Sequence, residues 1–211
     1  MMKIAIVTCT TKNREWLYSI TNPSKEMYCK KYGADYLFNN EVYYDTSCSP
    51  GWNKIRYIQE NLKDYDYLMW MDDDAGFVNF DRNIFDYMVN AIEDKMLLIC
   101  KDLNGINSGI MLLKNSTETK EFLDTVWNRR KEPRYIHDPR GWMEQGAIID
   151  WIVENSSKVA IGDGKIINSY DRIYCQSPIN QRNPQSVVLH IACGSAWKEA
   201  HKGLIRNLFV V

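Results

Sequence analysis

Strand-like apolar runs alternate with helical patterns along most of this chain of 211 residues. The strand candidates are residues 3–9, 34–39, 67–71, 96–100, 108–114, 158–162, 165–170 and 186–192. The helical patterns cover residues 24–33, 52–65, 83–94, 117–130 and 143–154. Such alternation predicts an α/β fold in which helices flank a mixed, mostly parallel sheet.

The length and charge of the chain narrow the class of protein. A chain of this length can bury a sizeable core as one domain. A formal net charge of -1 creates no field that would attract nucleic acid. No stretch approaches the roughly 18 consecutive apolar residues of a membrane-spanning helix. We therefore expect no nucleic-acid partner and no membrane span, and either a monomer or part of a larger polypeptide.

The cysteines indicate the redox compartment. They are scattered, without a C-x-x-C pair, at Cys9, Cys29, Cys48, Cys100, Cys175 and Cys193. Cys9 and Cys100 fall in strand-like apolar runs. This pattern favours reduced, packed thiols over a disulfide framework, and so a cytoplasmic location.

Three consecutive aspartates, Asp72, Asp73 and Asp74, follow the apolar run YLMWM and precede a turn-prone Ala75-Gly76. Like charges this close repel unless something positive neutralises them, and a divalent cation is a usual remedy. Two carboxylates one residue apart can share one Mg²⁺ or Mn²⁺ and leave positions open for phosphate oxygens. The alternative is a solvated acidic loop, which the buried character of the preceding strand disfavours.

Ligands of open α/β sheets collect beyond the carboxyl ends of the strands. Three segments occupy such places: residues 8–11, the aspartates at 72–74, and His190 near the end of the last strand candidate. An imidazole beside two carboxylates would favour Mn²⁺ over Mg²⁺. Taken alone, His190 fits a core histidine with a satisfied hydrogen bond better than it fits a ligand.

Other polar residues stand at the ends of elements. Asn107 and Ser108 precede an apolar strand and could hydrogen-bond sugar hydroxyls, or could simply form a turn. Glu144 and Gln145 stand at the predicted start of a helix, where carboxylates are favoured and ligands often bind. Lys54, near the start of another helix, could be an ordinary surface lysine.

Together these segments resemble glycosyltransferases of the GT-A fold. The resemblance is to the galactosyl- and xylosyltransferase family of yeast and plants and to the glycogenin-like family with its bacterial galactosyltransferases. The matching pieces occur in order as YCKKYGADYLF, WNK, YLMWMDDDAGF, INSGIMLLKN, MEQGAI and H-x-x-x-G. The chain is also similar to a glycosyltransferase domain of a large algal virus, which would place it in the host cytoplasm.

The resemblance implies a single GT-A domain over residues 1–211. Residues 1 to about 105 would form the nucleotide-binding half, and residues from about 106 to 211 the acceptor half. It also implies a metal site for Mn²⁺ or Mg²⁺ with Asp72, Asp74 and His190 as its protein ligands.

The resemblance further implies a binding site for a UDP-sugar. Its candidate residues, with Asp73 near the ribose, are Thr8, Cys9, Thr10, Arg14, Lys54, Asp73, Asn107, Ser108 and Lys198. Lys198 lies further beyond His190 than the family's lysine does. Gln145 matches a glutamine on the β-face of the donor sugar, and Glu144 stands where these relatives commonly carry aspartate.

The implied reaction is metal-dependent transfer of a hexose or pentose from a UDP-sugar to a glycan or other hydroxyl acceptor. If configuration is inverted, a carboxylate must accept the proton of the acceptor hydroxyl, and Glu144 is the first candidate, with Asp138 second. If it is retained, Gln145 would shield the developing cation. The alternatives are an inactive sugar-nucleotide or glycan-binding module, and a sugar-1-phosphate nucleotidyltransferase. The latter needs a Gly-rich loop after the first strand, and this chain has no glycine before Gly33.

Overall fold

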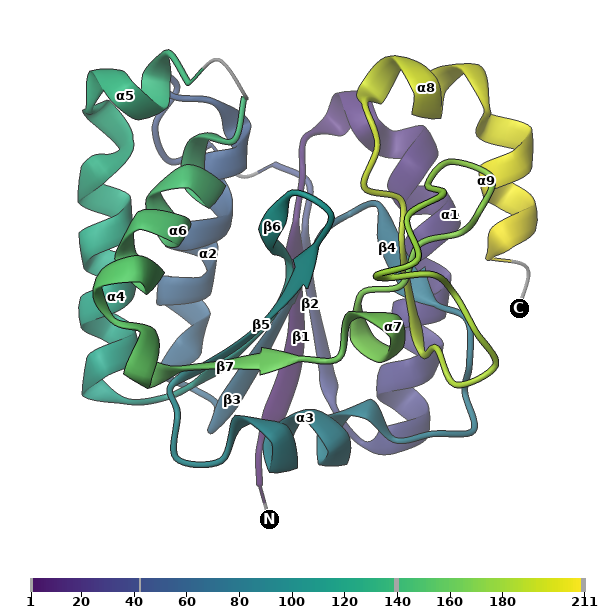
Figure 1. Cartoon of the computed structure of the whole chain (residues 1–211), viewed down its shortest axis with the longest axis horizontal. Helices are drawn as coiled ribbons and strands as arrows, with labels where there is room; N and C mark the ends of the chain where they lie inside the picture. Colours follow the sequence, from purple (N-terminus) through teal and green to yellow (C-terminus); the bar gives the residue numbers. More distant parts are fainter. Residues whose placement is uncertain (1, 42, 139–140, 210–211) are drawn as a thin grey trace.

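The computed structural model describes residues 2–41, 43–138 and 141–209. Within them a sheet of six strands has the order β2-β1-β3-β6-β5-β7 (Figure 1). Its strands are β1 (Ile4–Cys9), β2 (Asp35–Asn39), β3 (Tyr67–Met71), β5 (Leu97–Asp102), β6 (Gly105–Lys114) and β7 (Val159–Gly162). Strand β1 is parallel to β2 and β3, and β5 is parallel to β7. Strand β6 runs antiparallel between β3 and β5, so the predicted mixed α/β sheet is confirmed.

Helices cover both faces of this sheet, which explains the continuous apolar runs at 4–7, 67–71, 97–100 and 110–113 in its central strands. Leu68 and Trp70 of β3 face one core, and Met69 and Met71 face the other, because alternate side chains of a strand point to opposite faces. The first core is covered by α2 (Asn53–Leu62), α4 (Thr117–Asn128) and α6 (Met143–Glu154). The second is covered by α1 (Glu15–Tyr32) and α3 (Ile84–Ile92).

A second, two-stranded sheet stands beside the large one. It pairs β4 (Ala75–Phe77) with β8 (Val188–His190) in antiparallel register, so that Ala75 lies opposite His190. The prediction of a turn at Ala75-Gly76 is therefore wrong, and the strand predicted over 186–192 is shorter and lies outside the large sheet. Gly76 suits this place, because an added Cβ would approach Phe209 Cε1 and Ser24 Oγ to 2.7 Å.

Two further local predictions differ from the structure. The helix predicted over 24–33 begins at Glu15 and contains Pro23, because burial of Leu17 and neighbouring residues outweighs the hydrogen bond that the proline lacks. The strand predicted over 165–170 starts as a helix, α7 (Gly164–Ile167), which the Asp163 side chain caps by accepting from the Lys165 N–H. Ser169 then forms an isolated parallel bridge to Leu189.

The end of the described chain packs on α1. Helices α8 (Ser195–Ala200) and α9 (Lys202–Leu208) lie over the first half of α1 (Figure 1). Their contact is a small apolar cluster of Leu17, Leu189, Ile191, Ile205 and Phe209. A short helix, α5 (Pro133–Ile136), precedes α6, and brief 3-10 turns cover 12–14, 50–52, 129–131 and 156–158. In the described ranges no helix has the length and apolarity needed to cross a bilayer.

Candidate functional site

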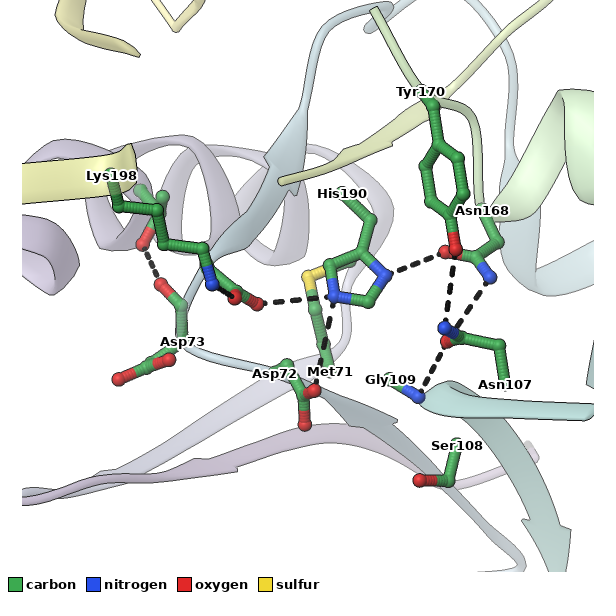
Figure 2. A network of polar contacts seen from close by, with 12 residues as sticks. Met71, Asp72, Asp73, Asn107, Ser108, Gly109, Asn168, Tyr170, His190 and Lys198 are labelled. Carbon is green, nitrogen blue, oxygen red and sulfur yellow. Dashed lines mark hydrogen bonds and ion pairs between the residues drawn. The ribbon is translucent and has the colours of Figure 1, made fainter. Parts of the chain in front are cut away.

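The three segments predicted at strand ends meet at one place. Oxygen atoms of Asp72 and Asp74 and a ring nitrogen of His190 lie within 4.8 Å of one another. The aspartates follow β3 of the large sheet, whereas His190 ends β8 of the small sheet. Figure 2 shows the imidazole of His190 directed towards Asp72. The structure thus brings together the three side chains predicted as metal ligands.

A cleft of about 460 Å³ opens beside these residues. Its walls come from the ends of β1 and β3, the segment 49–54 and the start of α6. The predicted site residues that line it are Cys9, Thr10, Arg14, Lys54, Asp72, Asp73, Asp74 and Glu144. The predicted residues Thr8, Asn107, Ser108, Gln145, His190 and Lys198 lie behind this lining or at its edge.

Asp73 faces a different partner from its two neighbours. It accepts hydrogen bonds of 2.6 Å from Nε and from Nη2 of Arg14, and a third from the Thr10 hydroxyl. Burial alone would lower the pKa of Arg14, but Asp73 outweighs it and raises the pKa. The bidentate pair fixes the guanidinium at the mouth of the cleft.

Lys54 is buried and links two carboxylates across the cleft. Its Nζ lies 3.1 Å from Asp72 Oδ1 and 3.2 Å from Glu144 Oε1. Burial alone would lower the pKa of Lys54, but the two carboxylates outweigh it and raise the pKa. The alternative of a surface lysine is therefore wrong, since this ammonium is a fixed positive charge inside the site.

Asp74 and His190 lie against each other at the edge of the cleft. Oδ1 of Asp74 is buried and has no hydrogen-bond partner among the described residues, although Nε2 of His190 lies 3.2 Å away. Oδ2 of Asp74 is paired with Lys198. Burial would raise the pKa of Asp74, but Lys198 and His190 outweigh it and hold the pKa well below its usual range. The carboxylate is therefore ionised.

This donor set fits a divalent cation. Two carboxylates and one imidazole nitrogen are ligands that suit Mn²⁺ in particular, and a buried oxygen without a donor is the kind of atom that an ion satisfies. The core-histidine alternative also predicted a hydrogen bond, and His190 makes one through Nδ1 to Asn168 Oδ1 at 2.8 Å. Its other nitrogen remains directed at the carboxylates.

Basic side chains already neutralise much of the acidic cluster, which the prediction assigned to a cation. Besides the arginine and lysines described above, Lys25 of α1 is fully buried and donates to the Asp72 carbonyl at 2.9 Å. Burial lowers the pKa of Lys25 to about 8, opposed by the three aspartates. The sequence analysis missed Lys25, although it shares a helical spacing with the buried residues Thr21 and Tyr28.

Thr8 and Cys9 end β1 beneath the cleft. The Thr8 hydroxyl donates to the Met71 carbonyl at 2.7 Å and is fully buried. Burial raises the pKa of the Cys9 thiol despite the nearby Lys54. Thr8 is therefore used in joining β1 to β3, and Cys9 presents a protonated thiol to the cleft.

The remaining predicted residues are held by other protein groups. Gln145 Oε1 accepts from the Ser108 N–H at 3.0 Å, which ties α6 to β6. Asn107 donates to Asp102 Oδ2 at 2.9 Å and points away from the cleft. Asp138 lies beside the first turn of α6, where an added Cβ on Gly146 would come within 3.2 Å of its Oδ2.

Comparison with known sequences gives a family match over most of the chain. The sequence matches the profile of the galactosyl transferase GMA12/MNN10 family over residues 1–91 and 81–201. An alpha-1,2-galactosyltransferase of Schizosaccharomyces pombe is 26% identical over 157 residues, which covers 57% of this chain and 41% of that protein. A probable xyloglucan 6-xylosyltransferase 1 of Oryza sativa subsp. indica is 24% identical over 201 residues, which covers 90% and 38%. The chain thus spans about two fifths of the length of these relatives.

Solved structures share the fold. A glycosyltransferase involved in the glycosylation of the major capsid of PBCV-1 superposes with a TM-score of 0.75 at 16% identity, covering 96% of this chain and 99% of that one. The galactosyltransferase LgtC, solved with donor and acceptor sugar analogs, gives a TM-score of 0.53 at 12% identity and covers 98% and 96%. At such identities the likeness shows the fold alone, and that fold is the predicted GT-A architecture.

Proposed function

The chain belongs to the galactosyl transferase GMA12/MNN10 family, and from this premise we propose that it transfers a sugar from a UDP-sugar to an acceptor hydroxyl with the help of a divalent cation. The cation, Mn²⁺ or Mg²⁺, would be held by Asp72, Asp74 and His190. One observation carries the proposal: a buried carboxylate oxygen without a donor faces an imidazole nitrogen at the edge of an open cleft.

The cleft suits a nucleotide-sugar in size and charge. Its volume of about 460 Å³ lies within the range of small-molecule sites. A bound cation would act as a Lewis acid that stabilises the negative charge on the departing diphosphate. Arg14, Lys54 and Lys198 place positive charge around the same space, where they would stabilise that charge without reorganising.

The side chains near the acceptor differ in what they could do. Glu144 borders the cleft and could accept a proton from an attacking hydroxyl if the configuration inverts. Gln145 adjoins it, and if the configuration is retained its amide oxygen, which accepts from the Ser108 N–H, would be the atom that shields the developing cation, because amide hydrogens carry positive charge. NMR of the anomeric configuration of the product would decide between the two. The names of the relatives suggest a hexose or pentose as the sugar.

Slow hydrolysis of the donor tests the proposal without knowledge of the acceptor. The protein is incubated with a panel of UDP-sugars and Mn²⁺, and release of UDP is measured. We expect release from at least one UDP-sugar, its loss on chelation of the metal, and its recovery when Mn²⁺ is restored. Binding of UDP without any release would identify an inactive binding module instead. Release that persists after chelation would remove the cation from the reaction.

A further inference from the structure

A chain of buried polar side chains runs from Asp102 to His190 behind the cleft. The Asn107 amide donates to Asp102 Oδ2 at 2.9 Å, and the Asn168 amide donates to Asn107 Oδ1 at 3.3 Å. Asn168 Oδ1 then meets His190 Nδ1 at 2.8 Å. Tyr170 closes the far end, since its hydroxyl donates to Asp102 Oδ2 at 2.8 Å. Figure 2 shows the part of this chain from His190 to Asn107.

Two groups of unambiguous polarity fix the direction of every bond in this chain. The Asp102 carboxylate accepts a hydrogen bond from Asn107, so the amide nitrogen of Asn107 must face it. The Gly109 backbone N–H can only donate, and it lies 2.9 Å from Asn107 Oδ1. Asn107 therefore presents its oxygen to Asn168, whose nitrogen must face that oxygen. Asn168 is left with its own oxygen towards His190.

The consequence reaches the ring of His190. Because Asn168 offers an oxygen, Nδ1 must carry the proton of the neutral imidazole, and Nε2 must carry a lone pair. In the neutral ring, Nε2 is therefore the nitrogen that faces the carboxylates, with Asp74 Oδ1 at 3.2 Å.

The ring is also confined on its flanks. A Cβ added to Gly109 would fall 2.2 Å from Cε1 of His190, so β6 must carry glycine where the imidazole crosses it. The Tyr170 ring packs edge-on, with its centroid 5.9 Å from that of His190. His190 and Asn168 are almost completely buried, so solvent does not compete for these contacts.

We propose that Asn168, Asn107 and Asp102 are positioning residues that hold His190 in the Nδ1–H tautomer with Nε2 presented to a cation. This inference rests on the proposed function, because the orientation of Nε2 matters only if a metal binds there. The hydrogen bonds that favour the Nδ1–H form belong to the protein itself, so they can be tested without a metal. Removal of a residue that hydrogen-bonds to a metal ligand typically lowers metal affinity by about 10- to 100-fold.

The decisive variant is Asn168→Leu, which keeps a similar volume and removes the acceptor of Nδ1. His190 should then move its proton to Nε2, because an Nε2–H can donate to the free oxygen of Asp74. Nitrogen NMR of ¹⁵N-histidine protein, at a pH where the imidazole is neutral, reports the tautomer, and the His190 signals are assigned by their loss in His190→Gln. We expect Nδ1–H in the parent and Nε2–H in the variant. Mn²⁺ affinity, measured by EPR, should fall about 10- to 100-fold.

A milder variant keeps the test independent of folding. In the parent, Asp102 Oδ1 accepts from the Asn104 backbone N–H and Oδ2 accepts from the Asn107 amide. Asp102→Asn replaces one of these oxygens by an NH₂ group, so one of the two donors then faces another donor. We expect a measurable share of Nε2–H and a loss of Mn²⁺ affinity of about tenfold. Asp35→Asn is the matched control, because Asp35 accepts from the Tyr65 hydroxyl at 2.9 Å on another strand of the same sheet. It should change neither the tautomer of His190 nor the Mn²⁺ affinity.

The outcomes separate this inference from the proposed function. An Nε2–H tautomer in the parent, or an Nδ1–H tautomer that survives Asn168→Leu and Asp102→Asn, overturns the inference while metal-dependent activity can still stand. The expected change of tautomer in a protein that binds no Mn²⁺ upholds the positioning role and overturns the proposed function.

Discussion

The carboxylates and the imidazole reach the same point on two different frameworks. Asp72 to Asp74 follow β3, which is hydrogen-bonded to β1 on one side and to β6 on the other. His190 ends a three-residue strand that pairs with β4 and is braced by Asn168 and the cluster beneath α9. The large sheet therefore fixes the aspartates through its backbone, whereas long-range side-chain contacts fix the histidine. The two frameworks should respond differently to substitution.

The largest effect should come from the large-sheet side, at Asp74→Asn. This change keeps the shape of the side chain but removes the charge that faces His190 and Lys198. We expect the affinity of Mn²⁺-dependent UDP binding to fall by more than about 100-fold, because loss of a metal ligand should cost more than loss of a residue that only hydrogen-bonds to a ligand. Calorimetric titration measures it, and circular dichroism checks the fold. Asp81→Asn, at an almost fully exposed carboxylate, is the control. Unchanged binding would show that the charge of Asp74 has no part in metal-dependent UDP binding.

The contact between the two frameworks is broken by Gly109→Ala. The added Cβ would overlap the imidazole, so His190 must move away from Asp72 and Asp74. We expect a loss of Mn²⁺ affinity of about 10- to 100-fold and a loss of stability of about 1–3 kcal/mol.

Gly203→Ala is the matched control for this change, because an added Cβ there would meet nothing within 4 Å. Wild-type affinity in Gly109→Ala would mean that the position of the ring does not matter for binding.

A smaller effect on binding should follow when the second framework is loosened from outside. Ile205 of α9 is fully buried, and Ile205→Ala should lower the free energy of unfolding by about 2–5 kcal/mol. Chemical denaturation measures this loss, with Leu204→Ala at an exposed neighbour as control. Mn²⁺ affinity of the folded protein should change little, because Asn168 still holds His190. A loss as large as that of Gly109→Ala would show that α9 itself positions the ring.

Glu144→Gln should leave metal and UDP binding unchanged and act on transfer alone. Glu144 belongs to α6 and forms an ion pair with Lys54. If the reaction inverts, turnover should fall by about 10²–10⁴-fold. Steady-state kinetics separates turnover from donor binding, and Glu154→Gln at the exposed end of the same helix is the control. Equal turnover in Glu144→Gln would remove this residue from the role of base.

The large sheet could be predicted from the sequence because its central strands are buried on both faces and contain continuous apolar runs. The small sheet could not, since Ala75-Gly76 becomes a strand only through pairing with β8, far along the chain. The start of α7 carried a readable signal in the capping residue Asp163, which the β-branched residues after it obscured.

The residues of the site also differ in whether the sequence alone could predict them. The aspartates follow an apolar strand and were predicted from their own surroundings, and the meeting of His190 with them was predicted from a strand-end rule and a family resemblance. Asn168 and Asp102 gave no local signal, because a buried amide chain exists only once distant segments have met. The donor-sugar role expected for Asn107 stays a prediction, since both of its amide hydrogens are already donated, to Asp102 and to Tyr170.

Lys54, Lys198 and Arg14 pair with carboxylates around the cleft, and Lys25 donates to the Asp72 carbonyl, so the protein itself supplies positive charge to the acidic cluster. We therefore expect the chain to fold without the ion. Under the proposed function, removal of the cation would therefore stop transfer while the chain stays folded, and return of the cation would restore transfer.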